Sequence, residues 1–193
     1  MHQPVVLAPP VPLREWRPIL PPGDVRAIYL HWTAHGYDDV FGAYHFCVTR
    51  PEDVVVHHTH DLRENMRDVR LDPDLPYAAH TGGRNSWALG ISIASMRDAA
   101  PSDFGPAPLT EAQLDGICAV AARLAAFYGV DTAAILTHAE AALADGYFGA
   151  GPGHQRWDIA RFRPSPAPLE PVEATRAGDW FRERIAALIA RAR

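Results

Sequence analysis

The chain has 193 residues, 48% of them hydrophobic and 21% charged, with a formal net charge of −5 at pH 7. This length and composition predict a single globular domain, residues 1–193, large enough for a sizeable hydrophobic core. A general nucleic-acid-binding protein would carry a basic surface, so the net charge argues against that class and nucleic acid is not an expected partner.

The N-terminal segment, residues 1–24, is rich in proline and predicts an extended arm on the surface. It lacks the basic start, apolar core and cleavage site of a signal peptide, and no apolar run approaches the roughly 20 residues that span a bilayer. We therefore expect a protein that is cytoplasmic as synthesised, without a transmembrane segment. Cys47 and Cys118 lie in apolar runs and are expected as buried free thiols.

Short apolar segments in the first part of the chain predict β-strands. Residues 26–32 form the first strand, and His31 lies at its end. Residues 43–50 and 53–58 are separated by a turn signal and predict a hairpin. Residues 62–76 are polar without a clear period, which indicates a loop.

A glycine-rich turn at residues 80–85 precedes the apolar run 88–94, which is short enough for a central strand. A helix is predicted to begin after Thr110, because Gln113 three residues later completes the pattern of a capping box. Leucine, isoleucine and alanine then recur at helical spacing, and Gly129 is the expected C-cap.

Residues 135–138 are a second short buried segment that ends in a histidine, and residues 141–155 predict a glycine-rich loop. A C-terminal helix is expected at residues 177–192, with Phe181 and Ile185 on its apolar face. Strands mixed with helices, including one hairpin, predict an α/β domain with a central mixed sheet flanked by α-helices.

Two apolar segments far apart in the sequence each end in a histidine, His31 and His138, and a carboxylate, Asp158, follows them. Two histidines and one carboxylate are a common catalytic zinc set, which leaves a fourth position for water. The spacing matches no local metal motif, so packed or salt-linked histidines are the alternative explanation.

A series of short motifs runs across residues 26–162: Ile-Tyr-Leu-His-Trp-Thr, Ala-Tyr-His-Phe, His-Thr-Gly-Gly-Arg-Asn-Ser, Leu-Gly-Ile-Ser-Ile, Leu-Thr-Glu-Ala-Gln, Thr-His-Ala-Glu and Arg-Trp-Asp-Ile. In this order the motifs resemble the type 2 N-acetylmuramoyl-L-alanine amidases, which include amidase-type phage lysozymes and the peptidoglycan recognition proteins. The resemblance implies a zinc site in a groove at the strand ends. It also implies hydrolysis of the amide between N-acetylmuramic acid and the L-alanine of the stem peptide.

The resemblance also implies a set of zinc ligands. His31 and His138 match the first and second ligands of the family. The family has cysteine or aspartate as the third ligand, often with a lysine two residues before it. Arg156 stands two residues before Asp158, which favours Asp158, and His154 is the alternative third ligand. A helix N-cap is the competing structural role for Asp158.

Four further residues are expected to act in catalysis. Tyr44 matches the family tyrosine beside the attacking water, and His80 matches a groove residue near the substrate. Arg156 would stabilise the oxyanion. Some members have a general-base glutamate where this chain has Ser92, so proton handling would pass to Tyr44, to Glu140 or to the zinc-bound hydroxide. The alternative role for Glu140 is to orient a histidine ring.

The expected function is that of a zinc-dependent N-acetylmuramoyl-L-alanine amidase acting on peptidoglycan or muropeptides as a monomer. Two alternatives remain, a zinc-free peptidoglycan-binding module and a zinc hydrolase with another acylated substrate. The expected setting is a phage or prophage endolysin that degrades the cell wall after release, or a cytosolic enzyme that recycles muropeptides.

Overall fold

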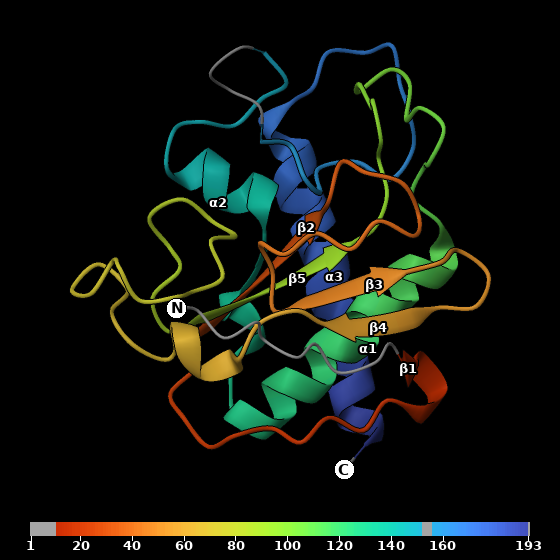
Figure 1. Cartoon of the computed structure of the whole chain (residues 1–193). Coiled ribbons are helices and arrows are strands. Elements are labelled where there is room, and N and C mark those ends of the chain that lie inside the picture. The colour runs from red at the N-terminus through yellow and green to blue at the C-terminus, as the bar shows by residue number, and fades with distance from the viewer. Residues whose placement is uncertain (1–10, 152–155, 193) are drawn as a thin grey trace.

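A six-stranded mixed sheet lies at the centre of the molecule (Figure 1). The computed structural model describes residues 11–151 and 156–192. In spatial order the strands are β1 (Val11–Pro12), β4 (Val55–His58), β3 (Phe46–Thr49), β5 (Ala88–Ile93), β2 (Ala27–Trp32) and β6 (Ile135–Thr137). The strands β3, β5, β2 and β6 run parallel, whereas β4 pairs antiparallel with both β3 and β1. The predicted α/β class, mixed sheet and hairpin are confirmed.

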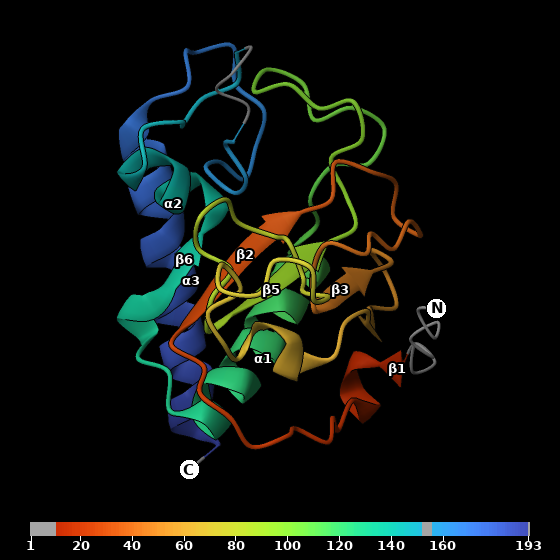
Figure 2. The same cartoon turned by 60° about the vertical axis from the view of Figure 1, so that its left-hand side comes forward.

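The two faces of the sheet differ because successive side chains of a strand point to opposite sides. On β2, Ile28 and Leu30 belong to the main hydrophobic core, whereas Tyr29 and His31 point to the other face. The helices α1 (Glu111–Tyr128) and α3 (Pro171–Arg191) pack against each other and cover the core face (Figure 2). The opposite face is therefore left to carry polar side chains.

Helix α1 begins and ends where the sequence predicts. Thr110 is the N-cap and accepts a hydrogen bond from the Gln113 backbone N–H, and Gly129 is the left-handed C-cap with φ of 70°. The buried Gln113 side chain does not close the capping box, because its Oε1 accepts from the Thr110 hydroxyl at 3.1 Å, and its amide donates to the Ala94 carbonyl at 3.0 Å. This bond ties the start of the helix to the residue that follows β5.

Two helix predictions are corrected by the structure. The C-terminal helix begins at Pro171 rather than at residue 177, because proline suits the first helical position and Glu170 and Glu173 form a capping box. Residues 141–144, predicted as loop, belong to the short helix α2 (His138–Ala144), which has its own capping box.

Smaller differences concern segment boundaries. The second predicted strand is shorter than 43–50, since only Phe46–Thr49 pair in the sheet. The predicted loop 62–76 contains the 3-10 helix Leu62–Asn65, and two further 3-10 helices span Leu13–Glu15 and Thr132–Ala134.

Part of the predicted N-terminal arm joins the sheet, and both thiols lie in the interior. Residues 1–10 of the arm lie outside the described residues, and Val11–Pro12 pair with β4 at the edge of the sheet. Both cysteines, Cys47 and Cys118, are buried and free, as predicted. Among the described helices, none has the length and apolar character needed to cross a membrane.

Candidate metal centre

The parallel pairing of β2 and β6 brings two histidines together. Leu30 is in register with Thr137, so the residues that follow, His31 and His138, are neighbours. Their ring centroids are 4.7 Å apart. Both lie at the carboxyl ends of parallel strands, which is where open α/β sheets usually bind ligands.

Asp158 reaches the histidines from a loop that is anchored by a backbone hydrogen bond and by the preceding tryptophan. Its carbonyl accepts a hydrogen bond of 2.6 Å from the Ala139 N–H, in the first turn of α2. The preceding residue, Trp157, is buried against Trp32 with ring centroids 4.4 Å apart. These contacts hold Asp158 next to His31.

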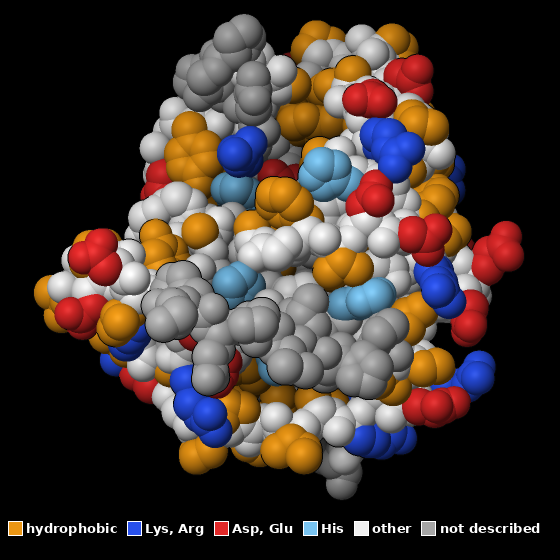
Figure 3. All heavy atoms as spheres, viewed as in Figure 1, with side chains coloured by type: hydrophobic (Ala, Val, Ile, Leu, Met, Phe, Trp, Pro, Cys, Tyr) orange, Lys and Arg blue, Asp and Glu red, His pale blue; other side chains and the backbone are white. Residues whose placement is uncertain are grey.

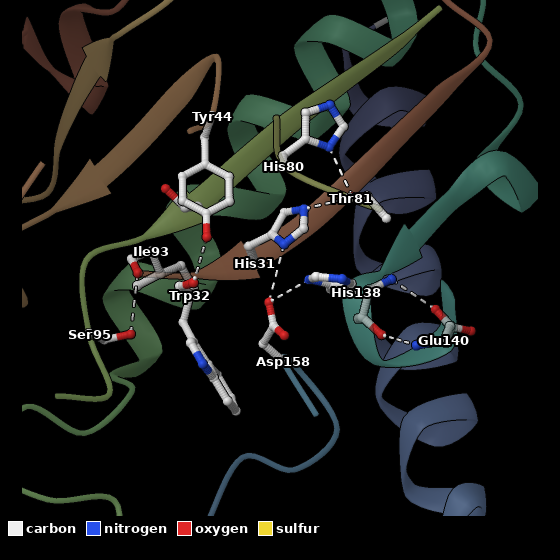
Figure 4. A network of polar contacts seen from close by, with 12 residues as sticks. His31, Trp32, Tyr44, His80, Thr81, Ile93, Ser95, His138, Glu140 and Asp158 are labelled. Carbon is white, nitrogen blue, oxygen red and sulfur yellow. Dashed lines mark hydrogen bonds and ion pairs between the residues drawn. The ribbon is translucent and has the colours of Figure 1, made fainter. Parts of the chain in front are cut away.

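The three side chains form a compact set of donors (Figure 4). The Oδ2 atom of Asp158 is 3.1 Å from Nδ1 of His31 and 3.3 Å from Nδ1 of His138. Zinc bonds of about 2.0–2.2 Å in a tetrahedron imply about 3.3–3.6 Å between ligand atoms. Both Asp–His distances are therefore compatible with a shared zinc ion. His154, the alternative third ligand, lies outside the described residues.

The protonation states also suit a metal. Burial is the main cause that lowers the pKa of His31 to about 4, so its ring is neutral at pH 7. Burial alone would raise the pKa of Asp158, but its interactions with His138 and His31 outweigh burial and hold this pKa below its usual range. A neutral imidazole and an ionised carboxylate are the forms that bind zinc.

Three fully or almost fully buried histidines predict a marked loss of stability at acid pH. Burial lowers the pKa of His31 to about 4 and of His45 to about 3, and it holds the pKa of His80 well below 6.5. The unfolded chain, with histidine pKa values near 6.5, then binds more protons than the folded protein. The free energy of unfolding should thus fall as the pH drops below about 6.5, by about 1.4 kcal/mol per pH unit for each histidine.

Urea denaturation of the metal-free protein between pH 7.5 and 5 would measure this slope. We expect a limiting slope of at least about three protons, because burial also lowers the pKa values of His57 and His58, and His45→Asn should remove about one proton from the slope. A free energy of unfolding that does not change over this range would contradict the neutral state of these rings.

Tyr44 and Arg156 line a cleft over the donor set. The cleft has a volume of about 550 Å³, and Figure 3 shows basic, acidic and histidine side chains around a hollow on this face. The Tyr44 ring lies 4.9 Å from that of His31, and its hydroxyl donates to the Trp32 carbonyl at 3.2 Å. Burial raises the pKa of Tyr44, as does the negative charge of Asp158 to a lesser extent, so its hydroxyl stays protonated.

Glu140 does not face the other site residues. Its carboxylate accepts the Thr137 N–H at 3.0 Å in the capping box of α2 and forms an ion pair with Arg182 of α3 at 2.8 Å. Gly178 makes room for it, because a Cβ atom there would lie 2.0 Å from the carboxylate. In Figure 4, Glu140 lies beyond His138, away from Asp158. These contacts favour a structural role.

We expect Glu140→Gln to lower the free energy of unfolding by roughly 3 kcal/mol, because it leaves the largely buried Arg182 charge without its main partner. Asp179→Asn is the matched control. It removes a carboxylate 2.7 Å from the same guanidinium, but that carboxylate is exposed, and the loss should be below about 1 kcal/mol. Zinc affinity should be the same in both variants. Unchanged stability with reduced catalysis in Glu140→Gln would instead support proton transfer.

Two hydroxyl groups that the sequence analysis did not identify lie behind the histidines. Thr81 Oγ1 is 3.3 Å from Nε2 of His31, and the Tyr147 hydroxyl is 3.3 Å from Nε2 of His138. Each of the two histidines thus has a hydroxyl partner on Nε2, whereas its Nδ1 faces Asp158. Thr81 directly follows His80 in the glycine-rich turn, which was the only signal in the sequence.

Residues 21–158 match the family model described as N-acetylmuramoyl-L-alanine amidase. No curated protein matches the chain. Among solved structures, the chain is similar to AmpDh3 from Pseudomonas aeruginosa, with 17% identity, a TM-score of 0.44, and coverage of 65% of this chain and 55% of that one. It is also similar to the N-acetylmuramyl-L-alanine amidase AmiD from E. coli in complex with its substrate, anhydro-N-acetylmuramic acid-L-Ala-D-γ-Glu-L-Lys. Here the identity is 18%, the TM-score 0.45 and the coverage 68% and 57%. The chain spans little more than half the length of either structure.

Proposed function

The chain belongs to the N-acetylmuramoyl-L-alanine amidase family, and on this premise we propose that it is a zinc-dependent hydrolase. The proposed reaction cleaves the amide between the lactyl group of N-acetylmuramic acid and the L-alanine of the stem peptide, in peptidoglycan or in muropeptides. The observation that carries the zinc proposal is the buried set His31, His138 and Asp158, whose donor atoms all lie within 4.8 Å of one another.

The donor set also bears on the alternatives. A peptidoglycan-binding module without zinc typically lacks a third ligand, whereas Asp158 lies within 3.3 Å of both histidines. The cleft above the set is large enough for the lactyl amide and its neighbouring groups. We therefore favour catalysis over binding alone.

The side chains of the cleft have distinct proposed roles. A bound zinc ion would supply Lewis-acid activation of water and of the scissile carbonyl. The Tyr44 hydroxyl donates to the Trp32 carbonyl, so its oxygen remains able to accept a hydrogen bond from the attacking water and to orient it. The Arg156 guanidinium lines the same cleft and would stabilise the negative charge that develops on the carbonyl oxygen.

Digestion of purified peptidoglycan sacculi, followed by mass spectrometry, tests the proposal. We expect free stem peptides that begin with L-alanine, intact glycan strands, and loss of the products when a chelator removes the metal. Soluble muropeptides assayed in parallel would identify the preferred form of the substrate. A protein that binds zinc and releases no peptide from either substrate would support the alternative of a zinc hydrolase with another acylated substrate.

A further inference from the structure

A chain of buried polar groups extends from the candidate metal centre through Thr81 to His80 (Figure 4) and ends at the backbone of β5. Nε2 of His31 is 3.3 Å from Thr81 Oγ1, which is 2.9 Å from Nδ1 of His80. Nε2 of His80 lies 3.4 Å from the carbonyl oxygen of Ala88. His31, Thr81 and His80 are at most 5% exposed, so water competes little for these contacts.

The position of His80 is set by the fold. Gly90 of β5 lies directly under the ring, and a Cβ atom at this glycine would approach three atoms of His80 to 2.5–2.7 Å. The rings of Tyr29, on β2, and His45, just before β3, flank His80, with centroids 5.8 and 5.6 Å from that of His80. The ring therefore rests on the strand backbone between two aromatic neighbours, with both nitrogens already engaged.

With the Ala88 carbonyl as the fixed acceptor, the donors and acceptors along this chain have one arrangement, whereas the Asp158 carboxylate at the other end, also an acceptor, favours the opposite one. A backbone carbonyl only accepts hydrogen bonds, so Nε2 of His80 carries the hydrogen and Nδ1 of the neutral ring is an acceptor. The Thr81 hydroxyl then donates to that Nδ1 and offers its lone pair to His31. Nε2 of His31 becomes the donor, which leaves the lone pair of its Nδ1 free on the side of Asp158.

We propose that Thr81 and His80 are positioning residues that hold His31 in the tautomer with a free Nδ1 lone pair, the form that a metal ion requires. The inference rests on the proposed zinc site. Without this chain, the carboxylate of Asp158, 3.1 Å from Nδ1, would favour a proton on that nitrogen and so block it. The Ala88 carbonyl thus controls a ligand that it does not touch.

Zinc affinity, measured by competition with a chelator, is the first test. Thr81→Val keeps the shape and removes the hydroxyl, and His80→Leu removes the acceptor for that hydroxyl. Each should weaken zinc binding by about 10–100-fold. Thr81→Ser and His80→Asn keep a hydroxyl and an acceptor, respectively, and should stay within about threefold of the unchanged protein.

The double variant Thr81→Val/His80→Leu separates a chain from two independent packing effects. If His80 acts through Thr81, the zinc affinity of the double variant should equal that of the single variant with the larger loss. Losses that multiply would overturn the inference, and so would a Thr81→Val protein with unchanged zinc affinity.

Imidazole ¹⁵N spectra of the zinc-loaded protein give a readout that packing alone would not move. We expect zinc on Nδ1 of His31 and a hydrogen-bonded proton on Nε2, whose resonance shifts upfield in Thr81→Val. Zinc on Nε2 would overturn the inference. A protein that binds zinc in this way but cleaves no peptidoglycan would refute the proposed activity and leave the chain intact, whereas a protein that takes up no zinc would refute the zinc site itself.

Discussion

Replacing His31 by alanine is expected to abolish zinc binding and peptidoglycan cleavage together. His31 is fully buried at the end of β2, and its Nδ1 atom is 3.1 Å from the Asp158 carboxylate. A three-ligand site that loses one imidazole keeps too few donors to hold the ion, and the Lewis acid is lost with it. Metal content by mass spectrometry and peptide release from sacculi should both fall to background.

His57→Ala is the matched control, because His57 is a histidine of β4 whose Nε2 contacts Thr49 Oγ1 rather than the donor set. It should keep both zinc and activity. The same assay decides the third ligand. Asp158→Ala should lose zinc as His31→Ala does, whereas His154→Ala should retain it. Peptide release by a zinc-free His31→Ala protein would refute the zinc mechanism.

The sequence predicted those parts of the fold that depend on local pattern. The short apolar segments before His31 and His138 were identified from their composition, and in the structure they are the strands β2 and β6. The capping signals at Thr110 and Gly129 also located the ends of α1 within one residue. Local chemistry determines these features, so one sequence is enough to read them.

Other features depend on contacts between distant segments. The register Leu30 to Thr137 places His31 beside His138, but strand order in a sheet leaves no local trace. The ion pair between Glu140 and Arg182 requires α2 to pack on α3, and α3 begins earlier than its apolar pattern suggests. Thr81 acquires its partner only when the glycine-rich turn folds over β2.

Replacing Arg156 by alanine should lower the rate of cleavage by about 10²–10³-fold and leave zinc affinity unchanged. Arg156 lines the cleft together with Tyr44 and Asp158, and its positive charge acts to lower the pKa values of His31 and Tyr44. It is therefore close enough to favour negative charge on a substrate oxygen without being a metal ligand. Steady-state kinetics on a defined muropeptide, with zinc content measured on the same samples, would test this.

The division of the effect between kcat and KM identifies what Arg156 stabilises. A charge that develops only in the transition state predicts a fall in kcat with little change in KM, whereas a contact to the bound substrate would raise KM. Arg156→Lys keeps the charge but not the planar guanidinium group, so its cleavage rate should lie between those of the unchanged protein and Arg156→Ala. Arg184→Ala, which removes an exposed arginine paired with Asp115 on the helical side, should be neutral. Zinc loss in Arg156→Ala would show instead that the arginine maintains the loop that carries Asp158.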